Sequence, residues 1–206
     1  MQAPTLLLVL DLVGIAAFAA SGALTGVQKS LDIFGVVFLS GVTAVGGGFL
    51  RDALIGATPV AALADWRYLV TPAVVGVAVF FVHPTVARLA RPLLLLDAAG
   101  LGLFAAAGTT KAIDHGIGPV GSVGIGMITA IGGGILRDVL VSEIPAVLHR
   151  EIYATAALAG AVIVVTGDRL GLAGAPVAVT AVLCTFVIRS VSRWRKWSAP
   201  VPRRAE

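Results

Sequence analysis

Long apolar runs separated by short polar segments account for most of this 206-residue chain. A helix that crosses a bilayer needs about 20 consecutive apolar residues, because the hydrocarbon interior is roughly 30 Å thick. Hydrophobic residues make up 58% of the chain and charged residues 13%, against about 45–50% and about 25% in soluble domains. A core of this size cannot bury the excess, so apolar side chains must face lipid. The sequence predicts an all-α integral membrane protein with seven transmembrane helices, at roughly 5–27, 33–56, 69–89, 92–113, 118–141, 151–167 and 174–191.

One sequence pattern occurs twice, at a constant offset of 86 residues. The matching segments are LLVLDLVGIAAFAASG at 7–22 with LLLLDAAGLGLFAAAG at 93–108, and TAVGGGFLRDAL at 43–54 with TAIGGGILRDVL at 129–140. About twenty of the 52 residues between 8 and 59 are identical to their counterparts, without a gap. A bias toward Gly, Ala and Leu does not produce matches such as Asp11/Asp97 and Arg51/Arg137 in one register. The pattern therefore indicates an internal duplication.

Each copy of the repeat holds three of the seven predicted spans. Because three is odd, the second copy enters the membrane in the opposite orientation to the first. Inverted repeats of this kind build many transporters, and the solute path then lies at the interface between the repeats. We divide the chain into a first three-helix repeat (1–91), a second, inverted three-helix repeat (92–168), a seventh helix without a counterpart (169–192) and a basic cytoplasmic tail (193–206).

The distribution of lysine and arginine predicts the orientation, because short cytoplasmic loops carry an excess of both. If the basic C-terminal tail is cytoplasmic, seven spans place four further basic residues on that side: Lys29, Arg88, Arg91 and Arg150. The outer side then holds Arg67, Arg169 and Lys111. We predict a multi-pass protein of the inner (plasma) membrane, with its N-terminus outside and its C-terminus cytoplasmic. Trp66 and Tyr68 suit an aromatic belt at the outer interface.

A GGGxxRD motif occurs in both copies. Its glycines are Gly46, Gly47 and Gly48 in the first copy and Gly132, Gly133 and Gly134 in the second. Each glycine inside a helix costs about 1 kcal/mol relative to alanine. We expect the helix to be kinked or broken there, which frees backbone groups that must face water, protein or an ion. Close packing of two helices is the alternative. Thr43 and Thr129 precede the triplets and either line a polar path or bond to their own helix.

The charged residues beside the triplets need partners, since an arginine at the centre of a membrane helix costs roughly 2.5–3.5 kcal/mol. Successive spans cross the membrane in alternating directions, so a residue's position in its span gives its depth in the membrane. These depths place Asp11 near Arg51 and Asp97 near Arg137. We predict two charged pore or gating clusters, one on each side of the glycine triplets. Salt bridges that only fix helix packing are the alternative. The full set is Asp11, Arg51, Asp52, Asp97, Arg137, Asp138 and Lys111, of which Lys111 can instead extend outward from the end of the fourth span.

Other classes of function find little support in the sequence. The three histidines and the single cysteine have no metal-ligand spacing, so we expect no metal site. No catalytic constellation or phosphate-binding loop is present, so we expect neither an enzyme nor a cofactor. A basic tail beside an apolar helix marks the cytoplasmic side rather than nucleic-acid binding.

The doubled GGGxxRD segments, the LDxxGxxxFAxxG openings and the seven predicted spans resemble the prokaryotic branch of the TRIC family, the trimeric intracellular cation channels. Sequences of this branch are also described as bacterial glycine-transporter-domain proteins. The resemblance covers about residues 5–190. It implies a homotrimer in which each protomer holds its own pore for monovalent cations, chiefly K⁺ and possibly Na⁺, in contact with membrane lipids. It also implies that the second and fifth spans are broken at the two glycine triplets.

Two classes of function remain after this resemblance. The favoured one is a passive cation channel with a hydrated path through each protomer. The runner-up is a secondary transporter for a small amino acid such as glycine, because helix breaks beside arginine and aspartate can bind a carboxylate and an ammonium group. Both need a hydrated, charged interior, so the residues alone do not separate them. A structural role without transport is a distant third.

Overall fold

The computed structural model describes residues 3–86, 90–149, 152–172, 174–195 and 197. Within these residues all regular secondary structure is α-helical, as the apolar runs predict. The helices are α1 (Ala3–Gln28), α2 (Ile33–Leu54), α3 (Ala61–Ala64), α4 (Arg67–Val86), α5 (Ala90–Asp114), α6 (Pro119–Leu140), α7 (Ala146–His149), α8 (Ile152–Arg169) and α9 (Ala175–Trp194). Arg88, Arg150 and most of the basic tail, for which the sequence predicts a cytoplasmic position, lie outside the described residues.

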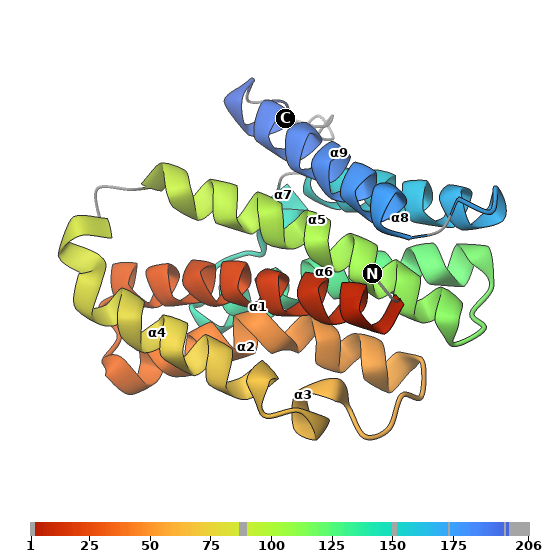
Figure 1. Cartoon of the computed structure of the whole chain (residues 1–206). Helices are drawn as coiled ribbons and strands as arrows, with labels where there is room; N and C mark the ends of the chain where they lie inside the picture. The colour runs from red at the N-terminus through yellow and green to blue at the C-terminus, as the bar shows by residue number, and fades with distance from the viewer. Residues whose placement is uncertain (1–2, 87–89, 150–151, 173, 196, 198–206) are drawn as a thin grey trace, which may run out of the picture.

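The long helices lie side by side and successive ones run in opposite directions (Figure 1). Each predicted span coincides with one of them. Judged on the described residues, α1, α2, α6, α8 and α9 are long and apolar enough to cross a membrane. The short helices α3 and α7 were not predicted. Each follows a GGGxxRD segment and a proline, Pro59 or Pro145.

Local sequence signals set several helix ends. Asp32 caps α2, because its carboxylate accepts a hydrogen bond from the Gly35 backbone N–H at 2.7 Å. α6 begins with Pro119, whose missing N–H and fixed φ suit the first turn of a helix. After α2, Gly56 takes a positive φ of 70°, the left-handed conformation that commonly follows a helix end. These signals keep the connections between the spans short.

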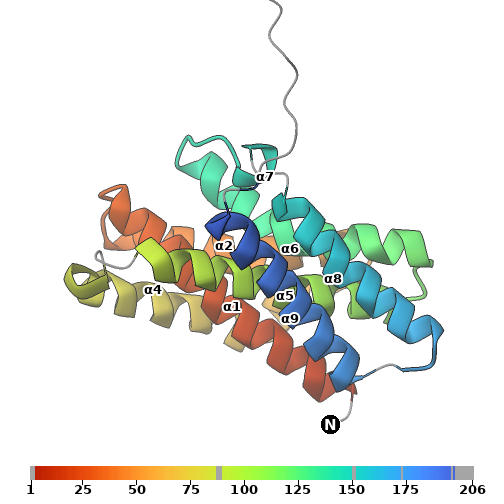
Figure 2. The same ribbon diagram turned by 90° about the horizontal axis from the view of Figure 1, so that it is seen from above.

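Corresponding helices of the two sequence copies run in opposite directions (Figures 1 and 2), and α1 packs against α5 and α2 against α6. Phe18 of α1 and Phe104 of α5 pack edge to face, with ring centroids 5.1 Å apart. Each ring also covers a glycine of the other helix, Phe104 on Gly14 and Phe18 on Gly100. These four residues are two pairs at the 86-residue offset. α1, α2, α5 and α6 thus form a central group, with α4 packed on α1 and α2, and α8 on α5 and α6.

Candidate functional site

α2 and α6 touch through their glycine triplets. A Cβ added to Gly47 would overlap the Thr129 carbonyl oxygen, and a Cβ added to Gly133 would overlap the Thr43 carbonyl oxygen. A Cβ at Gly132 would lie 3.2 Å from the Gly47 Cα. No side chain fits between the two backbones at this level. The α2–α6 crossing, as we call these contacts, is therefore a direct approach of one helix backbone to another.

The predicted helix breaks at the triplets are wrong. α2 is α-helical without interruption from Ile33 to Leu54 and α6 from Pro119 to Leu140, each triplet included. The physical reason is that the missing Cβ atoms are used between the helices, where they allow close approach. Close packing, the alternative that the sequence left open, accounts for these glycines in the conformation described, and their place in a pore stays a prediction.

Thr43 and Thr129 lie at the crossing but turn their hydroxyls to their own helices. Thr43 Oγ1 donates to the Leu39 carbonyl and Thr129 Oγ1 to the Ile125 carbonyl, each at 2.6 Å. Both threonines are fully buried. Their hydroxyls lie against glycines of α1 and α5, where a Cβ at Gly22 or Gly108 would come within 2.5 Å of the oxygen. In this conformation the threonines fill space and do not line an open path.

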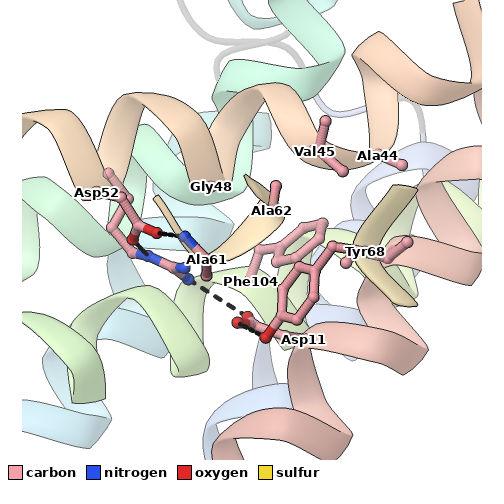
Figure 3. Close-up of a pocket in the computed structure, with 11 residues that line it drawn as sticks. Asp11, Ala44, Val45, Gly48, Asp52, Ala61, Ala62, Tyr68 and Phe104 are labelled. Atoms are coloured by element: carbon pink, nitrogen blue, oxygen red, sulfur yellow. Dashed lines mark hydrogen bonds and ion pairs between the residues drawn. The ribbon is translucent and has the colours of Figure 1, made fainter. Parts of the chain in front are cut away.

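The first charge cluster, which consists of Asp11, Arg51, Asp52 and Lys111, joins α1, α2 and α5. Figure 3 shows its Asp11 and Asp52 side chains. Arg51 Nη1 lies 3.3 Å from Asp11 Oδ1, and Arg51 Nε donates to Asp52 Oδ1 at 2.7 Å. Lys111 Nζ donates to the same Asp52 oxygen at 2.7 Å. The predicted contact between Asp11 and Arg51 is confirmed. Lys111 does not extend outward but points back into the cluster.

Two further contacts tie the first charge cluster to the starts of α3 and α4. Asp52 Oδ2 accepts a hydrogen bond from the Ala61 backbone N–H at 2.9 Å, and Tyr68 Oη donates to Asp11 Oδ2 at 3.1 Å. Asp65 sets the start of α4 by accepting the Arg67 backbone N–H at 3.0 Å. The Arg67 guanidinium beside it lowers the pKa of the exposed Asp65 carboxyl. Tyr68 is thus a partner of Asp11, a role that the sequence did not predict.

A small cavity adjoins the first charge cluster. It is lined by the charged residues Asp11, Arg51 and Asp52 together with Gly48, Tyr68 and apolar side chains (Figure 3). The space that it offers to a water-sized molecule is about 10 Å³. One water needs roughly 10–15 Å³ by this measure. The cavity is therefore too small to hold a hydrated ion. In the conformation described, no ion can pass through it.

The second charge cluster, which consists of Asp97, Arg137, Asp138 and Arg189, joins α5, α6 and α9. Arg137 Nη1 lies 3.2 Å from Asp97 Oδ1, and Arg137 Nε donates to Asp138 Oδ1 at 2.9 Å. Arg189 Nη2 lies 3.8 Å from Asp97 Oδ2. The predicted contact between Asp97 and Arg137 is confirmed. Tyr153, at 3.4 Å from Asp97, takes the place that Tyr68 has in the first cluster.

Both clusters balance their charges inside the helix bundle. Among the described residues, each cluster contains two carboxylates and two cations, and all four aspartates are at most 6% exposed. A buried charge without a partner is far more costly than a paired one. The outer oxygens of Asp52 and Asp138 are also satisfied, by the Ala61 and Ala146 backbone N–H groups.

Sequence reasoning missed three members of these sites. Tyr68 and Tyr153 lie 85 residues apart, one residue less than the 86-residue offset of the repeat. An alignment of the two copies with one gap would have paired them. Arg189 lies in the seventh predicted span, is only 3% exposed and lies 3.8 Å from Asp97. No residue of the first copy corresponds to it, so the repeat gave no signal.

Comparisons with known proteins agree with this architecture. A family model described as glycine transporter matches residues 8–84 and 94–169. A UPF0126 membrane protein of Deinococcus radiodurans is 51% identical over 154 residues, which are 74% of this chain and 72% of the relative. The UPF0126 inner membrane protein YadS of Escherichia coli K12 is 43% identical over 155 residues, 75% of each chain.

Solved structures extend the likeness to nearly the whole chain. A TRIC cation channel studied for the structural basis of its conductance matches with a TM-score of 0.89 at 34% identity, over 96% of this chain and 98% of its own. The TRIC trimeric intracellular cation channel orthologue of Rhodobacter sphaeroides matches with a TM-score of 0.87 at 40% identity, over 94% and 100%. These neighbours are channels rather than enzymes. The chain is therefore a multi-pass membrane protein that belongs to the prokaryotic branch of the TRIC family, whose sequences carry the glycine-transporter family model.

Proposed function

We propose that this protein is a channel for monovalent cations, permeable to K⁺, with the conduction path at the α2–α6 crossing of each protomer. The main support is that two charge-balanced clusters lie inside the helix bundle. They lie on α2 and α6, the two helices whose backbones touch at the glycine triplets. A membrane protein that needed only a packed core would not have to bury four carboxylates. The likeness to solved TRIC cation channels supports the same conclusion.

The path is closed in the conformation described. Thr43 and Thr129 present their carbonyl oxygens to the glycines of the opposite helix, with no space between them. If α2 and α6 separate, these two carbonyl oxygens face the gap. Oxygen dipoles of this kind replace the hydration shell of a permeating cation. Opening therefore requires relative movement of α2 and α6, which the two charge clusters hold to α1 and α5.

Seven spans and an inverted repeat are part of the proposal. The alternating directions of the long helices, together with the opposite directions of corresponding helices, support it (Figure 1). The match of one family model to two segments of nearly equal length supports the duplication. The N-terminus then lies outside and the C-terminus in the cytoplasm. Trimeric relatives support assembly of this chain as a homotrimer.

Transport of glycine is the second candidate, because the matching family model carries that description. A transporter needs a solute site that opens alternately to the two sides. The cavity beside Asp11 is smaller than an amino acid, and both Asp11 oxygens are already engaged by Arg51 and Tyr68. In the conformation described the cavity admits neither an amino acid nor a hydrated ion, so the likeness to solved TRIC cation channels is what favours the channel.

Purified protein in a planar bilayer separates the two candidates. We expect unitary current steps in KCl solution, carried by K⁺ rather than Cl⁻, as judged from the reversal potential in a KCl gradient. Saturable glycine uptake into proteoliposomes without such steps would establish the transporter instead.

A further inference from the structure

The two charge clusters obtain their second cation from different places. In the first cluster it is Lys111, near the end of α5, whose Nζ lies 2.7 Å from Asp52 Oδ1. The residue at the corresponding position of the first copy is Thr25, which carries no charge. The second cluster would therefore hold one arginine for two aspartates if the two repeats alone built it. Arg189 of α9 supplies the missing charge.

We propose that Arg189 is the counterpart of Lys111, a positioning residue that neutralises the second charge cluster and thereby holds the α2–α6 crossing closed. This assigns a role to α9, the long helix without a counterpart in the other repeat. The effect on ion flux rests on the proposed channel function. The effect on folding stability does not.

α9 is seated so that Arg189 reaches the cluster. Gly102 of α5 lies against α9, and a Cβ there would stand 2.8 Å from the Val182 carbonyl oxygen. Arg189 follows Val182 by about two helical turns on the same side. Its guanidinium carbon stands 4.4 Å from the centre of the Tyr153 ring, a cation–π contact. The side chain is 3% exposed, so its charge faces Asp97 and Tyr153 instead of water.

The position of Thr25 shows where a substitute charge would go. In the second cluster Arg137 Nη1 donates to Ser21 Oγ at 2.6 Å. Thr25 lies one turn beyond Ser21 on α1, where its hydroxyl donates to the Ser21 carbonyl at 3.0 Å. Lys111 lies one turn beyond the residue that corresponds to Ser21 and reaches Asp52. By the same geometry, a lysine at position 25 would reach Asp138.

The test compares Arg189→Gln, Thr25→Lys and the double variant as full-length protein. Arg189→Gln leaves Arg137 as the one cation beside two buried carboxylates, so the melting temperature in detergent should fall by about 5 °C or more. K⁺ flux per folded protein in proteoliposomes should rise, because the cluster gains net negative charge and holds α6 less firmly. Thr25→Lys alone adds a surplus cation and should also lower the melting temperature. In the double variant the melting temperature and the K⁺ flux should both return most of the way to the values of the unchanged protein.

Rescue by Thr25→Lys distinguishes charge balance from simple packing. If Arg189 acts only by stacking on Tyr153, a lysine on another helix cannot replace it, and the effects on melting temperature will add. Additive losses would overturn the proposal. Where Thr25→Lys is too bulky to fold, Asp97→Asn combined with Arg189→Gln restores neutrality without added volume, and the same criterion applies. Arg195→Gln, an exposed change just after α9, is the matched control and should alter neither quantity.

The two readouts also separate this proposal from the channel function. A melting-temperature rescue in protein that carries no K⁺ current would sustain the role of Arg189 and refute the channel. Currents that are unaffected by Arg189→Gln, together with additive melting temperatures, would sustain the channel and refute the role of Arg189.

Discussion

Buried charged side chains in this protein are held by ion pairs, and the same pair occurs in both copies of the repeat. Asp11 and Arg51 meet across α1 and α2, and Asp97 and Arg137 repeat the contact across α5 and α6. Depth along alternating spans was enough to predict both pairs from the sequence. It was not enough to find Arg189, because α9 has no copy and a long side chain reaches the cluster from outside the repeat.

The pair of Asp11 and Arg51 should show strong coupling. Removing one partner of a buried ion pair costs roughly 3–5 kcal/mol, because the other charge stays unpaired in a low-dielectric site. Asp11→Asn and Arg51→Gln should therefore each lower the thermal stability of detergent-solubilised protein, and the double variant should lose less than the sum. Strict additivity would show that the contact does not stabilise the fold. Asp65→Asn breaks an exposed pair with Arg67 and serves as the control, with little expected effect.

At the scale of helices, the crossing of α2 with α6 depends on the absence of Cβ atoms. The sequence showed that the triplets were unusual but not which property of glycine they used. A broken helix and a close crossing both need glycine, and only the identity of the neighbouring atoms decides between them. That neighbour is a carbonyl of the partner helix, which the sequence does not reveal. The spans themselves were predictable, because apolar runs of this length have one stable form in lipid.

Alanine substitutions along α2 and α6 test this crossing. Gly47→Ala and Gly133→Ala place a methyl group against a backbone carbonyl that cannot move aside, so both should lower thermal stability despite alanine's gain of about 1 kcal/mol in helix propensity. Gly41→Ala and Gly124→Ala lie on the same two helices with nothing within 4 Å. They should be neutral or stabilising. Equal behaviour of the two sets would mean that the helices do not touch as described.

In the molecule as a whole, we expect the two repeats to lie in the membrane in opposite orientations. In a Cys184→Ala background, Ser30→Cys should react with an impermeant thiol reagent only from the cytoplasmic side. Ala64→Cys should react only from outside, because a single span, α2, separates the two positions. Both residues are exposed, so accessibility does not limit the reaction. Labelling of both from one side would end the inverted-repeat model.

We expect ions to pass where α2 and α6 meet, and a disulfide that locks these two helices together tests this path. A Cβ at Gly46 would touch the Leu136 side chain across the crossing, so Gly46→Cys with Leu136→Cys, in the Cys184→Ala background, places two thiols opposite each other. Single-channel K⁺ currents should be present under reducing conditions, vanish once mass spectrometry shows the disulfide, and return with dithiothreitol. The two single-cysteine variants should conduct under both conditions. Undiminished currents through fully cross-linked protein would show that ions do not pass between α2 and α6.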